Sequence, residues 1–448
     1  MTTEKKRDHQ RNLSPTILVG CMGFLIICAW ACSPNRLRNP TTDVQLNENV
    51  DSKNSDHTIS QEGITQQTIR LGSVLALEGP EEIYGNRMKY GLKTALDDQL
   101  VQGKKIQLIF ENDYYEPLVT RQKTQKLIQS GIFLMIGNFG TPTAKETLPI
   151  LKINKIPAVG FYTGSQLLRS PSELIINYRA SYAQEIETVV KMALNAGVKP
   201  YEICAYVQDD SYGMSGLKAV RDALVKAQAE ENTLRAYDQV LEYKEKGNQG
   251  NDNSLLSPVG FYPRNTPYVK EGYNSLKQWE KNTGINCRLV ITAGTASNIA
   301  RFINLAQGEG EHWVVSSLSF THKEELQFNL EEYGVTDKVI ITEVVPSLDS
   351  DIPIVQEAKS KLKSEFDHVS LEGYIVGKMT LKILKTIPGE INRDSFLRQV
   401  AISKFDLGGV AIDFTEGRNQ SSDLILITVF SPQGFKHLNK DKLRDIFQ

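Results

Sequence analysis

Hydroxyl groups and free backbone N–H groups are expected to meet at one helix start in the first third of the chain. An apolar run at residues 132–136 is typical of a strand buried on both faces, and turn residues follow it. Thr141 is placed to cap the next helix with Pro142 in its first position, or Thr143 caps it with Glu146 in a capping box. Either helix start offers free N–H groups that receive a carboxylate well.

A second strand, Ile156–Gly160, is expected to end beside the same helix start. It delivers Tyr162, Thr163 and Gly164 to the carboxyl edge of the sheet, where open α/β sheets bind ligands. The stretch 133–164 therefore predicts a ligand crevice, with an ordinary helix start as the alternative reading of Thr-Pro-Thr.

Residue sets that are typical of catalysis or metal binding are missing from the sequence. Asp209 and Asp210 are adjacent carboxylates, but neighbouring loop side chains usually diverge and no nucleophile or histidine accompanies them. The sequence has no GxSxG elbow, no GxxxxGK phosphate loop and no GxGxxG opening a βαβ unit. We expect no enzyme, no cofactor and no metal site. The six histidines are scattered without metal-ligand spacing: His9, His57, His312, His322, His368 and His437.

Length and charge set broad limits on the class of protein. The chain has 448 residues, enough for two or three domains with sizeable cores. Its formal net charge is -2, so no nucleic-acid partner is indicated.

The N-terminus has the build of an export signal. Basic residues precede an apolar run, Ile17–Ala31, which is short for a membrane-spanning helix. Cys32 follows Ala-Trp-Ala, where a bacterial lipoprotein signal is cut and the cysteine acylated. Cys21 follows a cleaner Leu-Val-Gly, but cutting there leaves an apolar segment on the mature protein. We predict a lipoprotein signal peptide at 1–32, with an uncleaved anchor as the alternative; both place the body outside the cytoplasm.

Residues 33–67 have no aromatic residue and few apolar ones, so they are expected to form a flexible tether. If Cys32 carries the lipid, Cys204 and Cys287 are the cysteines of the folded part. Both lie in or near expected strands, and the sequence leaves open whether they are buried thiols or a disulfide.

Strand and helix patterns alternate along the body, which predicts a parallel, doubly wound sheet with helices on both faces. The alternation restarts after a bridge at Leu174–Tyr182, so we expect two α/β lobes of similar build. Residues 242–256, rich in Lys, Glu, Gly and Asn, are expected to form a surface loop insertion in the second lobe. Two lobes sent across a membrane suggest a ligand clamp that closes about a hinge.

Collinear segments of the body are familiar. The segments GNFGTPTAKETLPIL, IPAVGFYTGSQLLRSP and INYRASYAQE, then VQDDSYGMSGLKAVRDAL and FDLGGVAIDFTEG, stand in the order of one known family. The chain resembles the type I periplasmic solute-binding proteins of the branched-chain amino-acid group over roughly residues 68–438. The resemblance implies two doubly wound α/β lobes joined by three crossover strands, near Ser181, Pro346 and Phe405. The implied lobes are 68–181 plus 346–405 and 182–345 plus 406–440.

The same resemblance implies ligand contacts. Thr141 matches the residue that holds a ligand carboxylate through its hydroxyl and backbone N–H. Gly164 stands where amino-acid binders often have Thr, so Thr163 supplies that hydroxyl or it is missing. Tyr84 matches an aromatic wall residue, and Tyr212 matches the tyrosine that closes from the second lobe. The full set of expected ligand-binding residues is Tyr84, Phe139, Gly140, Thr141, Tyr162, Thr163, Gly164, Tyr212 and Ser319.

One departure concerns the carboxylate that receives a ligand ammonium. It is expected near Ser317–Phe320, but VSSLSF has none, and a buried ammonium without a partner is costly. Glu343 or Asp209 are the substitutes that nearby loops offer. The expected ligand is an amino acid, an amide or a carboxylate. The expected partners are a permease and ATPases of an ABC transporter, and a ligand sensor that uses the same clamp is the alternative.

Overall fold

The computed structural model describes residues 62–170, 172–252, 254–438 and 443–447. The predicted signal peptide, Cys32 and most of the predicted tether lie outside these residues. Residues 57–448 form one compact unit by their contacts. No helix in the described part of the chain has the length and apolar character needed to cross a membrane.

The first lobe is built on a six-stranded sheet with the order β2-β3-β1-β4-β5-β6. Its pairs are parallel except for β2 with β3. The strands are β1 (Thr68–Leu75), β2 (Leu100–Val101), β3 (Lys104–Asn112), β4 (Leu134–Ile136), β5 (Ala158–Val159) and β6 (Ile175–Ile176). Its helices are α1 (Glu82–Leu96), α2 (Pro117–Gln129), α3 (Thr141–Ile153), α10 (Pro353–Leu362), α11 (His368–Thr386) and α12 (Arg393–Ala401).

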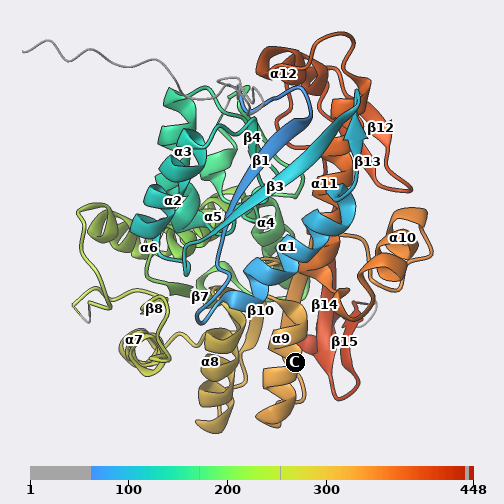
Figure 1. Cartoon of the computed structure of the whole chain (residues 1–448). Coiled ribbons are helices and arrows are strands. Elements are labelled where there is room, and N and C mark those ends of the chain that lie inside the picture. Colours follow the sequence, from blue (N-terminus) through green and yellow to red (C-terminus); the bar gives the residue numbers. More distant parts are fainter. Residues whose placement is uncertain (1–61, 171, 253, 439–442, 448) are drawn as a thin grey trace, which may run out of the picture. The chain divides into compact units, whose positions relative to one another are not determined.

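Helices α1 and α11, far apart in sequence, lie side by side in the first lobe (Figure 1). Glycines allow this close approach. A Cβ on Gly91 of α1 would lie 2.2 Å from the carbonyl oxygen of Ser370 in α11, so a larger side chain there would push the helices apart.

The second lobe is built on a seven-stranded sheet with the order β15-β14-β11-β10-β9-β7-β8. The five strands from β8 to β11 are parallel, and β14 and β15 are antiparallel additions at the edge. The strands are β7 (Ile203–Gln208), β8 (Val259–Tyr262), β9 (Leu289–Ala293), β10 (Val314–Ser317), β11 (Val339–Glu343), β14 (Leu426–Ser431) and β15 (Gly434–His437). Its helices are α4 (Tyr182–Asn195), α5 (Ser211–Lys226), α6 (Glu231–Glu245), α7 (Lys270–Thr283), α8 (Ala296–Gly308) and α9 (Lys323–Glu332).

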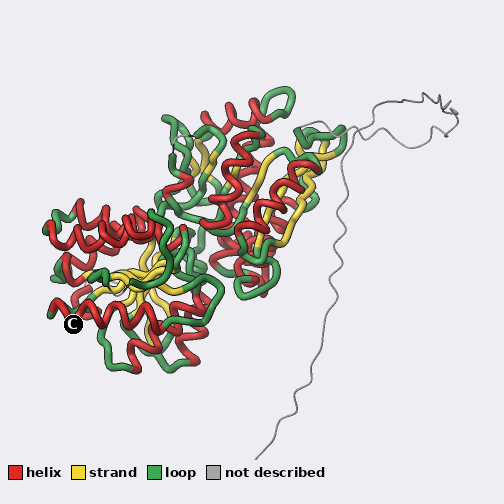
Figure 2. Tube along the Cα trace, turned by 90° about the vertical axis from the view of Figure 1, so that its left-hand side faces the viewer, coloured by secondary structure: helices red, strands yellow, loops and turns green. Residues whose placement is uncertain are grey.

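Strands lie between helices in both lobes (Figure 2), so the predicted class of two doubly wound α/β lobes is confirmed. A separate hairpin of β12 (Lys404–Asp406) and β13 (Ala411–Asp413), and the short α13 (Leu443–Ile446), complete the elements.

Two chain segments run side by side between the lobes. Asn177 forms a parallel bridge with Gln420, and the N–H groups of Ser421 and Ser422 donate to the carbonyls of Asn177 and Tyr178, each at 3.0 Å. These segments connect β6 to α4 and β13 to β14, so the chain passes between the sheets in paired strands of backbone.

The two cysteines of the body form a disulfide. Cys204 lies in β7 and Cys287 just before β9, with their Cα atoms 5.8 Å apart. The structure thus decides the question that the sequence left open, and the bridge ties neighbouring strands of the second sheet.

The expectation of a loop at 242–256 is wrong in its first part. Residues 242–245 form the last turn of α6, and Asn251 after it contacts strand β8. Lys244 donates to the carboxylate of Asp209 at 2.6 Å, while the amide of Asn251 exchanges hydrogen bonds with the backbone of Phe261. The Gly and Asn residues that indicate a loop begin only after residue 245. Before that point the buried Val240 and Leu241 anchor α6.

Candidate ligand-binding site

The start of α3 differs from both predicted caps. Its N-cap is Gly140, at φ 94°, and no side chain caps it. The hydroxyl of Thr143 donates backwards, to the carbonyls of Phe139 and Gly140, and the side chain of Glu146 pairs with Arg121 instead of forming a capping box. Both candidate capping hydroxyls are therefore engaged elsewhere.

Thr141 and Thr163 form a buried hydroxyl pair. Their Oγ1 atoms lie 2.6 Å apart, and the two side chains are 1% and 0% exposed. The loops after β4 and β5 thus bring together the two hydroxyl groups that are expected, from the sequence, to bind a ligand carboxylate. The first-turn N–H groups of α3 lie beside Thr141 because it is the first residue of the helix.

Gly164 is explained by packing. A Cβ there would lie 2.6 Å from the ring of Tyr182, and the backbone N–H of Tyr182 donates to the Gly164 carbonyl at 2.8 Å. Threonine therefore does not fit at this position, and Thr163 is the hydroxyl that this loop presents to Thr141.

Five aromatic rings fill the space between the lobes. Phe320, from the loop between β10 and α9, is fully buried, and four rings surround it at centroid distances of 4.5 to 5.8 Å. We call the four surrounding rings the aromatic box: Tyr84, Phe139 and Tyr162 from the first lobe, and Tyr212 from the second.

Tyr212 lies in the first turn of α5. Asp210 caps this helix by accepting a hydrogen bond from the Tyr212 N–H at 2.8 Å. The Tyr212 hydroxyl is fully buried and has no hydrogen-bond partner among the described residues, and burial raises its pKa well above the usual value.

Ser319 is brought beside a carboxylate that the sequence analysis missed. Glu185, in the first turn of α4, accepts hydrogen bonds from the Ser319 N–H at 2.8 Å and from its hydroxyl at 2.9 Å. Arg179 donates to the same hydroxyl at 2.9 Å. Burial raises the pKa of Glu185, and the charge of Arg179 opposes that rise.

A signal for Glu185 was present in the sequence. It directly precedes Ile186 and lies four residues before Val189, so it belongs to the buried face of α4. An acid on the apolar face of a helix needs a specific partner. Arg179 is also a buried charged residue that the sequence reasoning missed. Its Nε atom lies 3.3 Å from a carboxylate oxygen of the buried Glu372.

The two substitute acids suggested by the sequence are already paired. Glu343 binds Lys323 at 2.6 Å and His368 at 2.8 Å. Asp209 binds Lys244. Each of these carboxylates already has a cationic partner, so neither is placed to receive an ammonium group from a ligand.

An ionic network joins the lobes beside the box. His368 of α11 contacts Glu343 and Glu324 from the second lobe, and His322 of the second lobe contacts Asp367 at the start of α11 at 3.2 Å. Burial disfavours the charged form of His368 and so lowers its pKa. The carboxylates of Glu324 and Glu343 outweigh this effect and raise the pKa of His368 to about 9. The cation of His368 therefore links lobes at neutral pH. Among the described residues no group of three or more His, Cys, Asp or Glu side chains is arranged to hold a metal.

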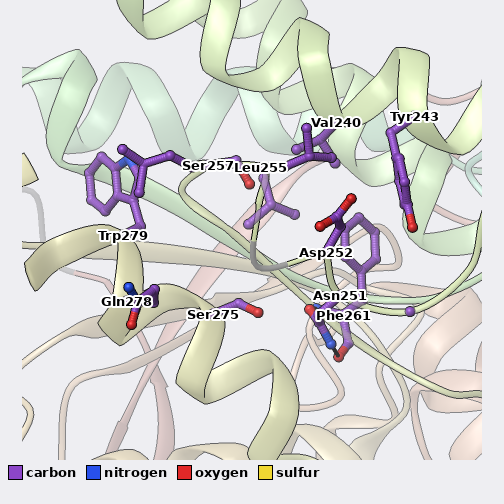
Figure 3. Close-up of a pocket in the computed structure, with 13 residues that line it drawn as sticks. Val240, Tyr243, Asn251, Asp252, Leu255, Ser257, Phe261, Ser275, Gln278 and Trp279 are labelled. Atoms are coloured by element: carbon purple, nitrogen blue, oxygen red, sulfur yellow. Dashed lines mark hydrogen bonds between the residues drawn. The ribbon is translucent and has the colours of Figure 1, made fainter. Parts of the chain in front are cut away.

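Between the described parts of the two lobes, the mouth of the interface holds more open space than the interior beside Tyr162. The interior beside Tyr162 and Arg179 has a cavity volume of about 10 Å³, whereas the mouth has about 810 Å³ and is lined by Thr141 from the first lobe and Asp210 from the second. A third hollow, which Tyr243 and Trp279 help to line (Figure 3), has a cavity volume of only about 20 Å³. It has room for about one water and not for a solute.

Comparison with known proteins agrees with this architecture. A family model described as a periplasmic binding protein matches residues 68–238. The crystal structure of a possible leucine/isoleucine/valine-binding protein from Rhodopirellula baltica is 29% identical, with a TM-score of 0.74 over 88% of this chain and 100% of that chain.

Two further relatives are more distant. A branched-chain amino-acid ABC transporter protein from Thermus thermophilus, solved with bound valine, is 14% identical, with a TM-score of 0.63 over 84% of this chain and 96% of that chain. Leu/Ile/Val-binding protein homolog 6 of Brucella abortus is 21% identical over 166 residues, which are 36% of this chain and 42% of that protein. The match thus spans less than half of this curated relative. The resemblance seen in the sequence is confirmed: the chain is similar to periplasmic binding proteins of the leucine/isoleucine/valine type, in sequence over residues 68–238 and in fold along the body.

Proposed function

We propose that the protein is an extracytoplasmic, lipid-anchored solute-binding protein of an ABC transporter. It captures an amino acid or a related small polar carboxylate or amide between its two lobes and hands it to a membrane permease that works with cytoplasmic ATPases. The lipid is carried by Cys32.

The observation that carries this proposal is the hydroxyl pair at the start of α3. Thr141 and Thr163 lie 2.6 Å apart beside free N–H groups of a helix start, which is a favourable setting for a carboxylate. The aromatic box is close in the chain, since Tyr162 directly precedes Thr163 and Phe139 lies two residues before Thr141. The proposed site is formed by Tyr84, Phe139, Gly140, Thr141, Tyr162, Thr163, Gly164, Tyr212 and Ser319.

The disulfide supports a location outside the cytoplasm. Structural disulfides persist in oxidising compartments and are rare where thiols are kept reduced. The Cys204–Cys287 bridge lies within the second-lobe core, and it agrees with export directed by the segment before Cys32.

The mechanism is differential affinity for two states of the clamp. A solute that touches Thr141 in the first lobe and Tyr212 in the second makes its full set of contacts only when the lobes meet. Its binding therefore shifts the equilibrium towards the closed state. No step requires bond making or breaking, and the proposal gives the protein no enzymatic role.

A ligand sensor is the second candidate, and the direct contacts between the lobes favour it. Tyr84, His322 and His368 each bond across the interface, so the clamp can close on its own side chains. In its closed state, a sensor would signal to a partner protein instead of delivering the solute to a permease. Deleting the gene should impair uptake of a radiolabelled solute if transport is the role, and leave uptake intact if sensing is.

The test of the proposed function is a binding screen. The purified protein is scanned by differential fluorimetry against amino acids, amides and short carboxylates, and small-angle scattering follows compaction with each solute that shifts the melting temperature. We expect at least one solute to raise the melting temperature and to shift the scattering curve towards the closed state. Silence across the whole panel would contradict solute capture.

A further inference from the structure

We propose that Phe320 is a built-in occupant of the solute site, and that the solute which displaces it carries an aromatic ring. This inference rests on the proposed function, because it names the class of solute and the residue that competes with it.

The ring of Phe320 has the surroundings of a bound aromatic group. Phe139 and Tyr84 stack beside it at interplanar angles of 19° and 20°, with centroids 5.1 and 5.8 Å away. Tyr162 and Tyr212 close the remaining sides in tilted orientations at 5.4 and 4.5 Å. Offset and tilted ring pairs at these distances are favourable, and they select a flat ring over an aliphatic chain of similar volume.

Three of the four rings of the box belong to the first lobe, whereas Phe320 belongs to the second. The ring therefore crosses the interface and enters the other lobe, as a solute held there would. Its separation from the box would expose all five rings to water, so its presence favours the closed arrangement of the lobes.

The loop that carries Phe320 is fastened on both sides of the ring. On one side, Ser319 donates two hydrogen bonds to Glu185. On the other, the hydroxyl of Thr321 donates to the carbonyl of Gly294 at 2.8 Å. The Tyr162 hydroxyl adds a bond from the first lobe to the Ser319 carbonyl at 3.2 Å. These anchors hold the ring inside the box in the closed arrangement of the lobes.

The space around the occupant is too small for a second ring. The interior cavity next to Tyr162 and Ser319 has a volume of about 10 Å³, which fits at most one water. A ring-bearing solute enters the box only if Phe320 leaves it. A solute without a ring gains nothing from the box and leaves Phe320 in place.

The polar half of such a solute has a defined place. The Thr141–Thr163 hydroxyl pair follows Phe139 and Tyr162 in their loops, so a carboxylate at the start of α3 lies at the edge of the box. The chemistry on both sides fits an aromatic carboxylate or an aromatic amino acid.

The test compares the wild-type protein with Phe320→Ala, Phe320→Trp and Phe430→Ala. Phe430 is a phenylalanine of the second lobe, 2% exposed and outside the box, and it controls for general loosening of that lobe. Calorimetry measures the affinity for L-phenylalanine, phenylacetate and L-alanine, and small-angle scattering measures the radius of gyration without solute.

We expect Phe320→Ala to bind phenylacetate or L-phenylalanine roughly 10- to 100-fold more tightly than wild type, because the competing ring is gone. Its affinity for L-alanine should not improve, and its radius of gyration without solute should rise. Phe320→Trp and Phe430→Ala should show no gain.

Four results overturn the proposal. The first is an unchanged or weaker affinity of Phe320→Ala for both ring-bearing probes. The absence of measurable binding in every protein tested counts as this result. The second is an equal gain for L-alanine, and the third is an equal gain in Phe430→Ala. If the wild-type protein binds a ringless solute tightly, solute capture stands and the inference about Phe320 fails. If no natural solute is found but Phe320→Ala gains the ring probes and expands, the inference stands and the proposed function fails.

Discussion

The hydroxyl of Tyr84 accepts a hydrogen bond of 3.0 Å from the backbone N–H of Ala296, which ties α1 of the first lobe to the start of α8 in the second. A second bond of 3.3 Å comes from the N–H of His322, just before α9. One phenolic oxygen thus satisfies donors at the starts of two second-lobe helices.

Removing that oxygen should weaken the contact between the lobes. Tyr84→Phe leaves two buried N–H groups without an acceptor, at a cost of about 1–3 kcal/mol. We expect lower unfolding free energy in urea and a larger radius of gyration by small-angle scattering. Tyr90→Phe, at a tyrosine that is 44% exposed, is the matched control. Equal behaviour of the two variants would show that the Tyr84 bonds contribute nothing to closure.

The His368 bridge should make stability fall in alkaline solution. Its pKa is raised to about 9 in the folded protein by Glu324 and Glu343, against an ordinary value near 6.5. A raised histidine pKa means that the stabilisation is complete below pH 6.5 and disappears as pH rises through about 9. We expect wild type to lose roughly 2–3 kcal/mol more than His368→Gln between pH 6.5 and 9.5 in urea titrations. The exposed His312→Gln should lose as much as wild type, and an identical loss in His368→Gln would contradict the assignment.

Glu81 should make stability depend on pH because its carboxyl group is buried near another acid. Burial, and the nearby Glu325 from the second lobe, raise the pKa of Glu81 to about 8. A raised carboxyl pKa means that stability is lost as pH rises from the ordinary range through about 8. Glu81→Gln removes this charge, so its stability relative to wild type should increase between pH 5 and pH 9 by a few kcal/mol. The exposed neighbour Glu82→Gln should show no such trend, and a flat difference for Glu81→Gln would contradict the raised pKa of Glu81.

The disulfide should stabilise the second lobe. Cys204 and Cys287 are 83 residues apart in sequence, and closing such a loop typically contributes about 2–4 kcal/mol. We expect dithiothreitol to lower the unfolding free energy of wild type by this amount. The double variant Cys204→Ala with Cys287→Ala should start at the lower value and be insensitive to the reductant. Insensitivity of wild type would mean that the two thiols are unlinked in solution.

Much of the fold was predictable because buried parallel strands leave a strong local signal. The runs 132–136 and 203–207 are continuous and apolar, and β4 lies within the first while β7 begins at the start of the second. The ends of helices were less predictable. At α3 the decisive contact of Thr141 is with Thr163, twenty-two residues away, so a local capping rule chose the wrong residue.

The residues of the candidate site were predictable as individual loop positions, but their arrangement was not. Phe320 enters the box only through tertiary folding, since its partners come from three separate first-lobe segments and from α5. The role of Glu185 depends likewise on Ser319, 134 residues later. Helical periodicity places Glu185 on a buried face, and it cannot say which distant groups that side chain meets.

The most direct test of solute capture is calorimetric titration of wild type, Thr141→Val and Thr386→Val with the solutes found by fluorimetry. Thr386 is an exposed threonine near the end of α11 and serves as the control. A hydrogen bond to a charged group contributes about 1.5–3 kcal/mol, so we predict that Thr141→Val weakens a carboxylate-bearing solute by roughly 10- to 100-fold while Thr386→Val leaves its affinity unchanged. Equal affinity of Thr141→Val and wild type, or the absence of any binding solute, would contradict the account.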